Sequence, residues 1–309
     1  MTSKSQGVTR ELSEGRPVRA CRMIFYVVAA LILGAMGSGF FDDKGAPYSQ
    51  IETYGVYFFL GILGAVIANS TGAGGGIVFL PFFTSLGFSL NQSLATSFGI
   101  QCFGMTAGAL TWLIYKKEDA PQDAVTGDFR RAFLVAATGS LLGLRGAQEW
   151  MPVPAVDVKV LFSVFSIAVG LLILQRTLSS CPRMERRTEP LGGTELLGLG
   201  VVGLIGGAIT AWLSVGVGEL VAVYLIGLRF RVNHAVALAV CVSSVTVITG
   251  LPHYLGSGSI VVGVVSFAAV GALIGGTLAK RLAVALGTKR LKVGMALWII
   301  VSSIIYLMV

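Results

Sequence analysis

The sequence predicts an all-α membrane protein: an inverted repeat of one re-entrant broken-helix hairpin plus three transmembrane helices, preceded by one extra N-terminal transmembrane helix. Only 12% of the 309 residues are charged, against about 25% in soluble proteins, and the mean hydropathy is +0.81. The apolar residues form runs long enough to cross a bilayer. The same order of runs occurs twice, and a glycine-rich break interrupts the first run of each copy.

The N-terminal extension comes before the repeats. Residues 1–22 are polar and basic, and we expect a cytoplasmic tail. Residues 23–41 form an apolar run that is long enough for one crossing. A cleaved signal peptide is the alternative, although no A-x-A-like cleavage site follows the run.

The first repeat covers residues 54–175, and its first apolar run is broken in the middle. The break reads Asn69-Ser70-Thr71-Gly72-Ala73-Gly74-Gly75-Gly76. Each glycine costs about 1 kcal/mol relative to alanine inside a helix. The arm after the break, residues 77–86, makes roughly 15 Å of helix, about half of the hydrocarbon core. We therefore expect a hairpin; a tight helix crossing on the glycines is the alternative. Three apolar segments follow, at about 92–115, 129–148 and 156–175.

A charged linker, residues 176–193, leads to the second repeat, residues 194–309, which follows the same plan. The run 196–213 is broken at Val215-Gly216-Val217-Gly218-Glu219 and continues as a short arm, 220–228. Three apolar segments follow again, at about 233–256, 259–279 and 291–309.

Two sets of glycines support the internal repeat. Gly72 and Gly74 align with Gly216 and Gly218 at an offset of 144 residues, and Gly139 and Gly143 align with Gly271 and Gly275. The later pairs place small residues on one helix face, where a neighbouring helix can approach closely.

Positive charge favours hairpins over single crossings of the broken runs. If both runs crossed the membrane, the Lys and Arg residues would divide 14 inside and 9 outside; with hairpins they divide 20 and 3. The positive-inside rule prefers the second division. Each repeat then has an odd number of spans, so the second enters from the opposite side, as in many secondary transporters. We expect the N-terminus in the cytoplasm and the C-terminus outside.

The two breaks would face each other near the middle of the membrane, with polar residues around both. The candidate ligands are Asn69, Ser70, Thr71, Gly72, Gly74, Gly75, Gly76, Thr96, Ser97, Gln101, Ser214, Gly216, Gly218, Ser243 and Ser244. Loosened amides and hydroxyls without a full counter-charge favour a small anion. For any single Ser or Thr, a hydrogen bond to its own helix is the alternative.

Glu219 is an ionisable residue at the second break, where the first break has Gly75. Carboxylates inside a membrane are costly and often couple transport to protons. The alternative places Glu219 near the cytoplasmic face, paired with Arg229 or Arg231.

No metal or other cofactor is expected, because the four cysteines show no paired spacing and no GxxxxGK[ST] motif is present. The net charge of +8 lies in short loops, which indicates orientation signals rather than binding to nucleic acid. The expected partners are a small anion and the lipid bilayer.

The first break and the segment after it carry a family resemblance. Gly72-Ala73-Gly74-Gly75-Gly76-Ile77-Val78-Phe79-Leu80-Pro81, followed by Asn91-Gln92-Ser93-Leu94-Ala95-Thr96-Ser97, resembles the signature of the TauE/SafE sulfite exporter family. The resemblance covers about residues 55–309. It implies a secondary transporter of sulfite or organosulfonates such as sulfoacetate, usually an exporter across the bacterial inner membrane. The N-terminal extension and Glu219 depart from the family pattern.

Three other functions remain as alternatives to an exporter of sulfur anions. They are a passive small-anion channel, an importer of small carboxylates and an intramembrane enzyme. The chain has no HExxH or GxSxG motif and no second membrane carboxylate to pair with Glu219, so we do not expect an enzyme.

Overall fold

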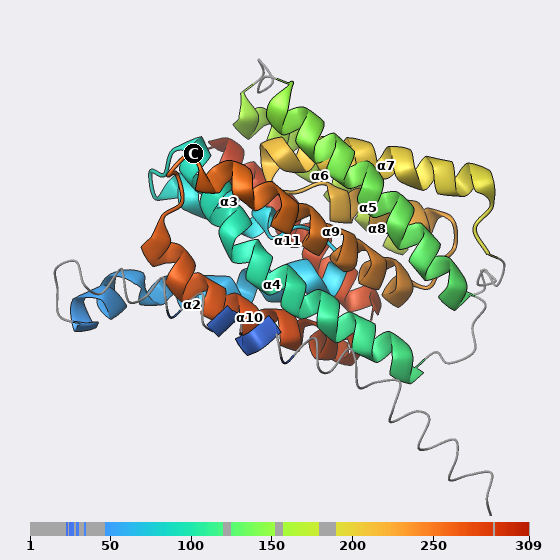
Figure 1. The fold of residues 1–309 in the computed structure, drawn as a ribbon, viewed down its shortest axis with the longest axis horizontal. Helices are drawn as coiled ribbons and strands as arrows, with labels where there is room; N and C mark the ends of the chain where they lie inside the picture. The colour runs from blue at the N-terminus through green and yellow to red at the C-terminus, as the bar shows by residue number, and fades with distance from the viewer. Residues whose placement is uncertain are drawn as a thin grey trace, which may run out of the picture.

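The computed structural model describes residues 47–119, 125–151, 157–178, 190–286 and 288–308, with a few residues between 23 and 34. The expected tail 1–22, most of the expected span 23–41 and much of the linker lie outside the described residues. The helices are α2 (Pro47–Thr71), α3 (Gly76–Ser85), α4 (Leu90–Asp119), α5 (Val125–Glu149), α6 (Val158–Leu178), α7 (Gly193–Leu213), α8 (Val217–Gly227), α9 (Val232–Leu255), α10 (Val262–Leu286) and α11 (Thr288–Met308) (Figure 1).

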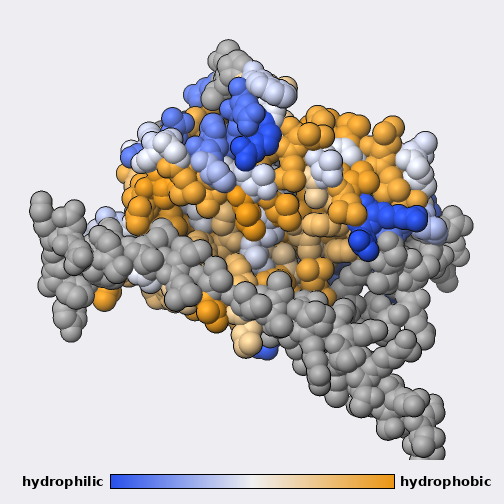
Figure 2. Space-filling model, in the orientation of Figure 1, coloured by the Kyte–Doolittle hydropathy of each residue, from blue (hydrophilic) through white to orange (hydrophobic). Residues whose placement is uncertain are grey.

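The described residues confirm an all-α membrane protein. Six of their helices (α2, α4, α6, α7, α9 and α10) are long and apolar enough to cross a bilayer. Two of the six, α2 and α7, are the first arms of the broken runs, and the expected spans 129–148 and 291–309 are not among the six. Hydrophobic residues cover most of the described surface on the face shown in Figure 2. In the most apolar 18-residue stretch of each helix, the buried share is 72% for α9 and 61% for α4. It is only 33% for α2 and for α6. The helices α4 and α9 therefore form the centre of the bundle.

Both broken runs fold back as hairpins. In the first, Gly64 of α2 lies against Phe79 of α3, and farther from the break the Tyr57 ring contacts Phe83. In the second, the start of α8 bonds to the end of α7, and the Tyr224 hydroxyl donates to a carbonyl in the first turn of α7. The arms are unequal, because α2 has 25 residues and α3 has 10.

Small residues join each hairpin to a helix of the other half. The glycines of the aligned pairs each lie against the backbone of the neighbouring helix, as their spacing predicts. The close approaches are Gly271 to Phe58, Gly275 to Ile62, Gly139 to Gly200 and Gly143 to Leu204. The residue numbers rise together in each pair of helices, so α2 is parallel to α10 and α5 is parallel to α7.

The first arms of the two hairpins run in opposite directions through the bundle (Figure 1). Further contacts fix these directions. The helix α4 is parallel to α10, through Gly99 with Val265 and Gly104 with Ala272, and antiparallel to α9, through Phe98 with Tyr254 and Thr106 with Ser244. The helix α5 is parallel to α9, through Ser140 with Thr246 and Leu144 with Gly250. Opposite directions of α2 and α7 are what an inverted repeat requires. The descent of the halves from one unit and their orientation in a membrane stay predictions.

Replacing Gly143 with valine is expected to lower the melting temperature of the purified protein. A side chain there overlaps the Leu204 carbonyl oxygen, which is backbone and cannot turn away. Forcing α5 and α7 apart costs about 1–3 kcal/mol. Gly146→Val is the control, since Gly146 is on the same helix and a Cβ atom added there would have nothing within 4 Å. Equal losses in both variants would contradict the role of close packing.

Candidate anion site between the two hairpin tips

The two breaks touch each other inside the bundle. A Cβ atom added at Gly76 would lie 2.5 Å from the Ser214 carbonyl oxygen, and one added at Gly74 would lie 3.2 Å from it. The chain turns sharply at both breaks, with φ of +82° at Gly72 and +140° at Gly216, where glycine avoids the strain of a side chain. The glycines therefore let two hairpin tips from different halves meet.

Glu219 connects the two tips. The Gly74 N–H donates to one carboxylate oxygen of Glu219 at 2.7 Å, and the Gly216 N–H donates to the other at 2.8 Å. The side chain is 2% exposed. Hydrogen bonds from amides to an ionised carboxylate are shorter and stronger than neutral ones. The expected alternative for Glu219, an arginine pair near the surface, does not describe this position.

Gln101 of α4 forms a second polar link beside the first. Its side-chain oxygen accepts the Gly75 N–H at 2.8 Å. Its Nε2 donates to the Ser97 hydroxyl at 2.9 Å and to the Ser214 hydroxyl at 2.7 Å, and these two hydroxyls lie 2.9 Å apart. Each hydroxyl carries one proton, and only one is used between them, so this network retains one hydroxyl proton for a further acceptor.

The three polar residues before the first break satisfy the backbone near them. Asn69 donates to the Ala65 and Gly104 carbonyls, so it joins α2 to α4. Ser70 and Thr71 both donate to the Ile67 carbonyl of their own helix. Thr71 also accepts the N–H of Ala73. The bonds of Ser70 and Thr71 match the alternative of a hydrogen bond to the residue's own helix.

Two of the other candidate hydroxyls bond away from the tips. Thr96 accepts the Val261 N–H at 3.2 Å, and Ser244 lies 2.9 Å from the Thr106 hydroxyl on α4.

Ser243 lies beside Gly218, the residue before Glu219. A Cβ atom added at Gly218 would come within 2.6 Å of the Ser243 oxygen and would overlap the carbonyl oxygen of Gly72. The Ser243 hydroxyl is buried, and among the described residues it has no hydrogen-bond partner. It is therefore a polar group at the tips with capacity to bind.

Thr210 supports the second tip, although it was not among the predicted ligands. Its hydroxyl accepts the Val217 N–H at 3.0 Å and donates to the Gly206 carbonyl at 2.7 Å. The signal in the sequence is a single hydroxyl one turn before Ser214 in an apolar run.

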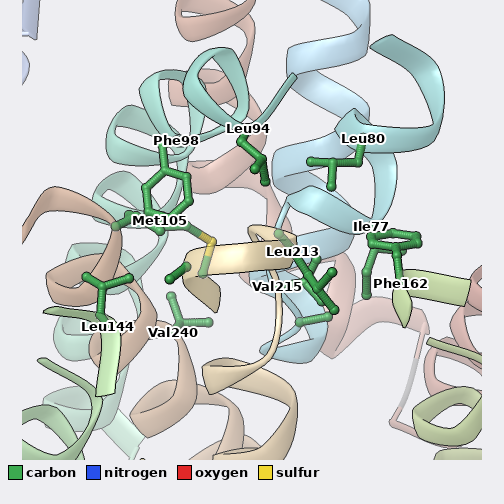
Figure 3. Packing of buried hydrophobic residues seen from close by; sticks show 14 of the residues in the cluster. Ile77, Leu80, Leu94, Phe98, Met105, Leu144, Phe162, Leu213, Val215 and Val240 are labelled. Atoms are coloured by element: carbon green, nitrogen blue, oxygen red, sulfur yellow. The ribbon is translucent and has the colours of Figure 1, made fainter. Parts of the chain in front are cut away.

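Buried apolar side chains from both halves pack together in this part of the bundle (Figure 3). Val215 and Leu213 flank Ser214, Ile77 comes from α3, and Met105 and Val240 come from the central helices α4 and α9. All five are buried. In such surroundings hydrogen bonds to a charge are stronger than in water.

A comparison with known protein families gives a match. The family model described as "Sulfite exporter TauE/SafE" matches residues 57–306, most of the chain and both hairpins. The searches of curated proteins and of solved structures gave no match. The chain is therefore a multi-pass integral membrane protein that belongs to the TauE/SafE family of sulfite exporters.

Proposed function

We propose that this protein is a secondary transporter that exports sulfite or an organosulfonate such as sulfoacetate across a bacterial inner membrane. The anion would bind between the two hairpin tips. The observation that carries the proposal is the meeting of buried amides and hydroxyls from both halves at one place. Neutral donors of this kind bind an oxyanion by hydrogen bonds and release it again.

Alternating access is the mechanism proposed for this transporter, and the same arrangement supports it. The first arms, α2 and α7, enter from opposite ends of the bundle, and their tips share one site. Rocking one half against the other would open that site to one end at a time. We place the N-terminus in the cytoplasm and the C-terminus outside, in accordance with the positive-inside rule.

Proton coupling is assigned to Glu219 in this proposal. It is a buried carboxylate at the site, and a proton taken up there would move with or against the anion. Proton-linked transport that is unchanged in a Glu219→Gln variant would remove this role.

Counterflow in proteoliposomes tests the proposed function. Vesicles loaded with unlabelled sulfite should accumulate labelled sulfite, and sulfoacetate, thiosulfate or taurine outside should compete in the order of their affinity. Accumulation against a gradient separates a coupled transporter from a passive channel. The proposal would be contradicted if simple carboxylates or neutral solutes were transported and sulfur oxyanions were not.

Replacing Ser214 with glycine is expected to weaken sulfite transport about tenfold, since a hydrogen bond to a charged group contributes about 1.5–3 kcal/mol. The melting temperature should change little, because Ser214 has φ +58°, a conformation that costs a residue other than glycine about 1–2 kcal/mol. Initial rates in proteoliposomes and thermal unfolding measure the two effects.

Arg229→Gly is the matched control, since Arg229 has φ +66° and lies outside the site. Its transport should equal that of the wild type. Unchanged transport in Ser214→Gly would mean that the hydroxyl does not contact the anion.

A further inference from the structure

Glu219 binds backbone amides of the anion site that is proposed above. Its two oxygens take the N–H groups of Gly74 and Gly216, one from each hairpin tip. We propose that the Glu219 carboxylate is a tethered occupant of the anion site, which holds the tips together without substrate and must leave both amides before a free oxyanion binds. This inference rests on the proposed function, because it concerns the regulation of the same site.

The Glu195 carboxylate provides a comparison, because it caps a helix by a local hydrogen bond. Glu195 stands in the first turn of α7 as Glu219 stands in that of α8, and it accepts the Gly192 N–H at 2.8 Å. That bond is local. Glu219 makes the same local bond to Gly216, but its other oxygen reaches Gly74, which is 145 residues away in the sequence. Glu219 therefore joins the two halves of the protein in addition to capping α8.

The surrounding groups offer more hydrogen-bond donors than the Glu219 carboxylate uses. The buried Ser243 hydroxyl beside Gly218 has no partner among the described residues. The Ser97–Ser214 pair keeps one hydroxyl proton for a further acceptor. With the two amides these are four donors, whereas the carboxylate uses two. A sulfonate or sulfite ion has three oxygens and fits this donor set better than a carboxylate does.

The Glu219 carboxylate and a transported anion do not bind the N–H groups of Gly74 and Gly216 at the same time. In a buried site of low dielectric, like charges a few ångströms apart repel strongly, and neither Gly74 nor Gly216 carries a compensating charge. Removing the Glu219 carboxylate should therefore free the two N–H groups for an added anion. A small carboxylate such as formate should then replace the missing side chain.

The experiment uses the full chain purified in detergent, at constant ionic strength, with sodium formate and sodium sulfite as probes and sodium chloride as the salt control. Glu219→Ala should melt below the wild type, and formate or sulfite should restore its melting temperature. Labelled sulfite should bind to it at least about tenfold more tightly than to the wild type, the equivalent of one charged hydrogen bond. Glu195→Ala, the matched control, should show neither the restoration of the melting temperature by anions nor the tighter binding of sulfite.

If Glu219→Ala does not fold, Glu219→Gln keeps the shape of the side chain. Its oxygen accepts one of the two N–H groups, while its NH₂ group faces the other, so sulfite affinity should still rise. Sulfite affinity at or below that of the wild type in the folded variants, without rescue by formate, overturns the inference.

The two proposals fail in different ways. Rescue of Glu219→Ala by formate, with no sulfite counterflow by the wild type, supports the tethered carboxylate and overturns the proposed transport. Sulfite counterflow by the wild type, with no anion rescue of the variants, overturns the tethered carboxylate alone.

Discussion

Replacing Gly218 with alanine should abolish sulfite counterflow and lower the melting temperature. The added methyl group overlaps the Gly72 carbonyl oxygen and lies 2.6 Å from the Ser243 oxygen. The Gly72 backbone belongs to the other hairpin tip, so the two tips must separate. Overpacking of this kind costs about 1–3 kcal/mol. Separation also breaks the bond from Gly74 to Glu219, which depends on tip contact.

The control for this change is Gly193→Ala. Gly193 is in the first turn of α7, as Gly218 is in the first turn of α8, and nothing lies within 4 Å of an added Cβ there. Its stability and counterflow should match the wild type. Normal counterflow by Gly218→Ala would show that the tips do not need to touch during transport.

Replacing Gln101 with leucine should have the second large effect. Leucine has a similar size but leaves the buried Gly75 N–H without its acceptor, at a cost of about 1–3 kcal/mol. It also removes the donor that orients the hydroxyls of Ser97 and Ser214. Counterflow should fall to background, and thermal unfolding should occur at a lower temperature.

Gln92→Leu provides the comparison on the same helix. Gln92 is exposed and accepts the Ser89 N–H at the start of α4, far from the tips. Counterflow by this variant should stay at the wild-type rate. Similar counterflow by the Gln101 and Gln92 variants would exclude Gln101 from the site.

The breaks and their short second arms could be predicted from the sequence, because glycine cost and apolar run length are local properties. The predicted second arm, 77–86, agrees with α3 to within a residue at each end. The first arm begins at Pro47, earlier than residue 54, where the sequence predicts its start. Residues 47–53 are mostly polar, but Pro47 suits the first position of a helix, and α2 begins there.

The candidate site was predicted less completely, because its contacts depend on which helix faces lie at the level of the tips. Gln101, Ser97 and Ser214 are brought together there. Ser70 and Thr71 are next to a break in the sequence, yet their hydroxyls donate to the Ile67 carbonyl of their own helix. The reach of Glu219 to Gly74 crosses 145 residues of sequence, and no local pattern encodes it.

The position of a bound anion tests the central claim most directly. A crystal structure of the protein with 2-bromoethanesulfonate, located by anomalous scattering from its bromine, would show where the sulfonate binds. We predict the sulfonate between the hairpin tips, on the amides of Gly74 and Gly216, with the Glu219 carboxylate displaced from both. A sulfonate bound elsewhere, with Glu219 still on the two amides, would contradict the account.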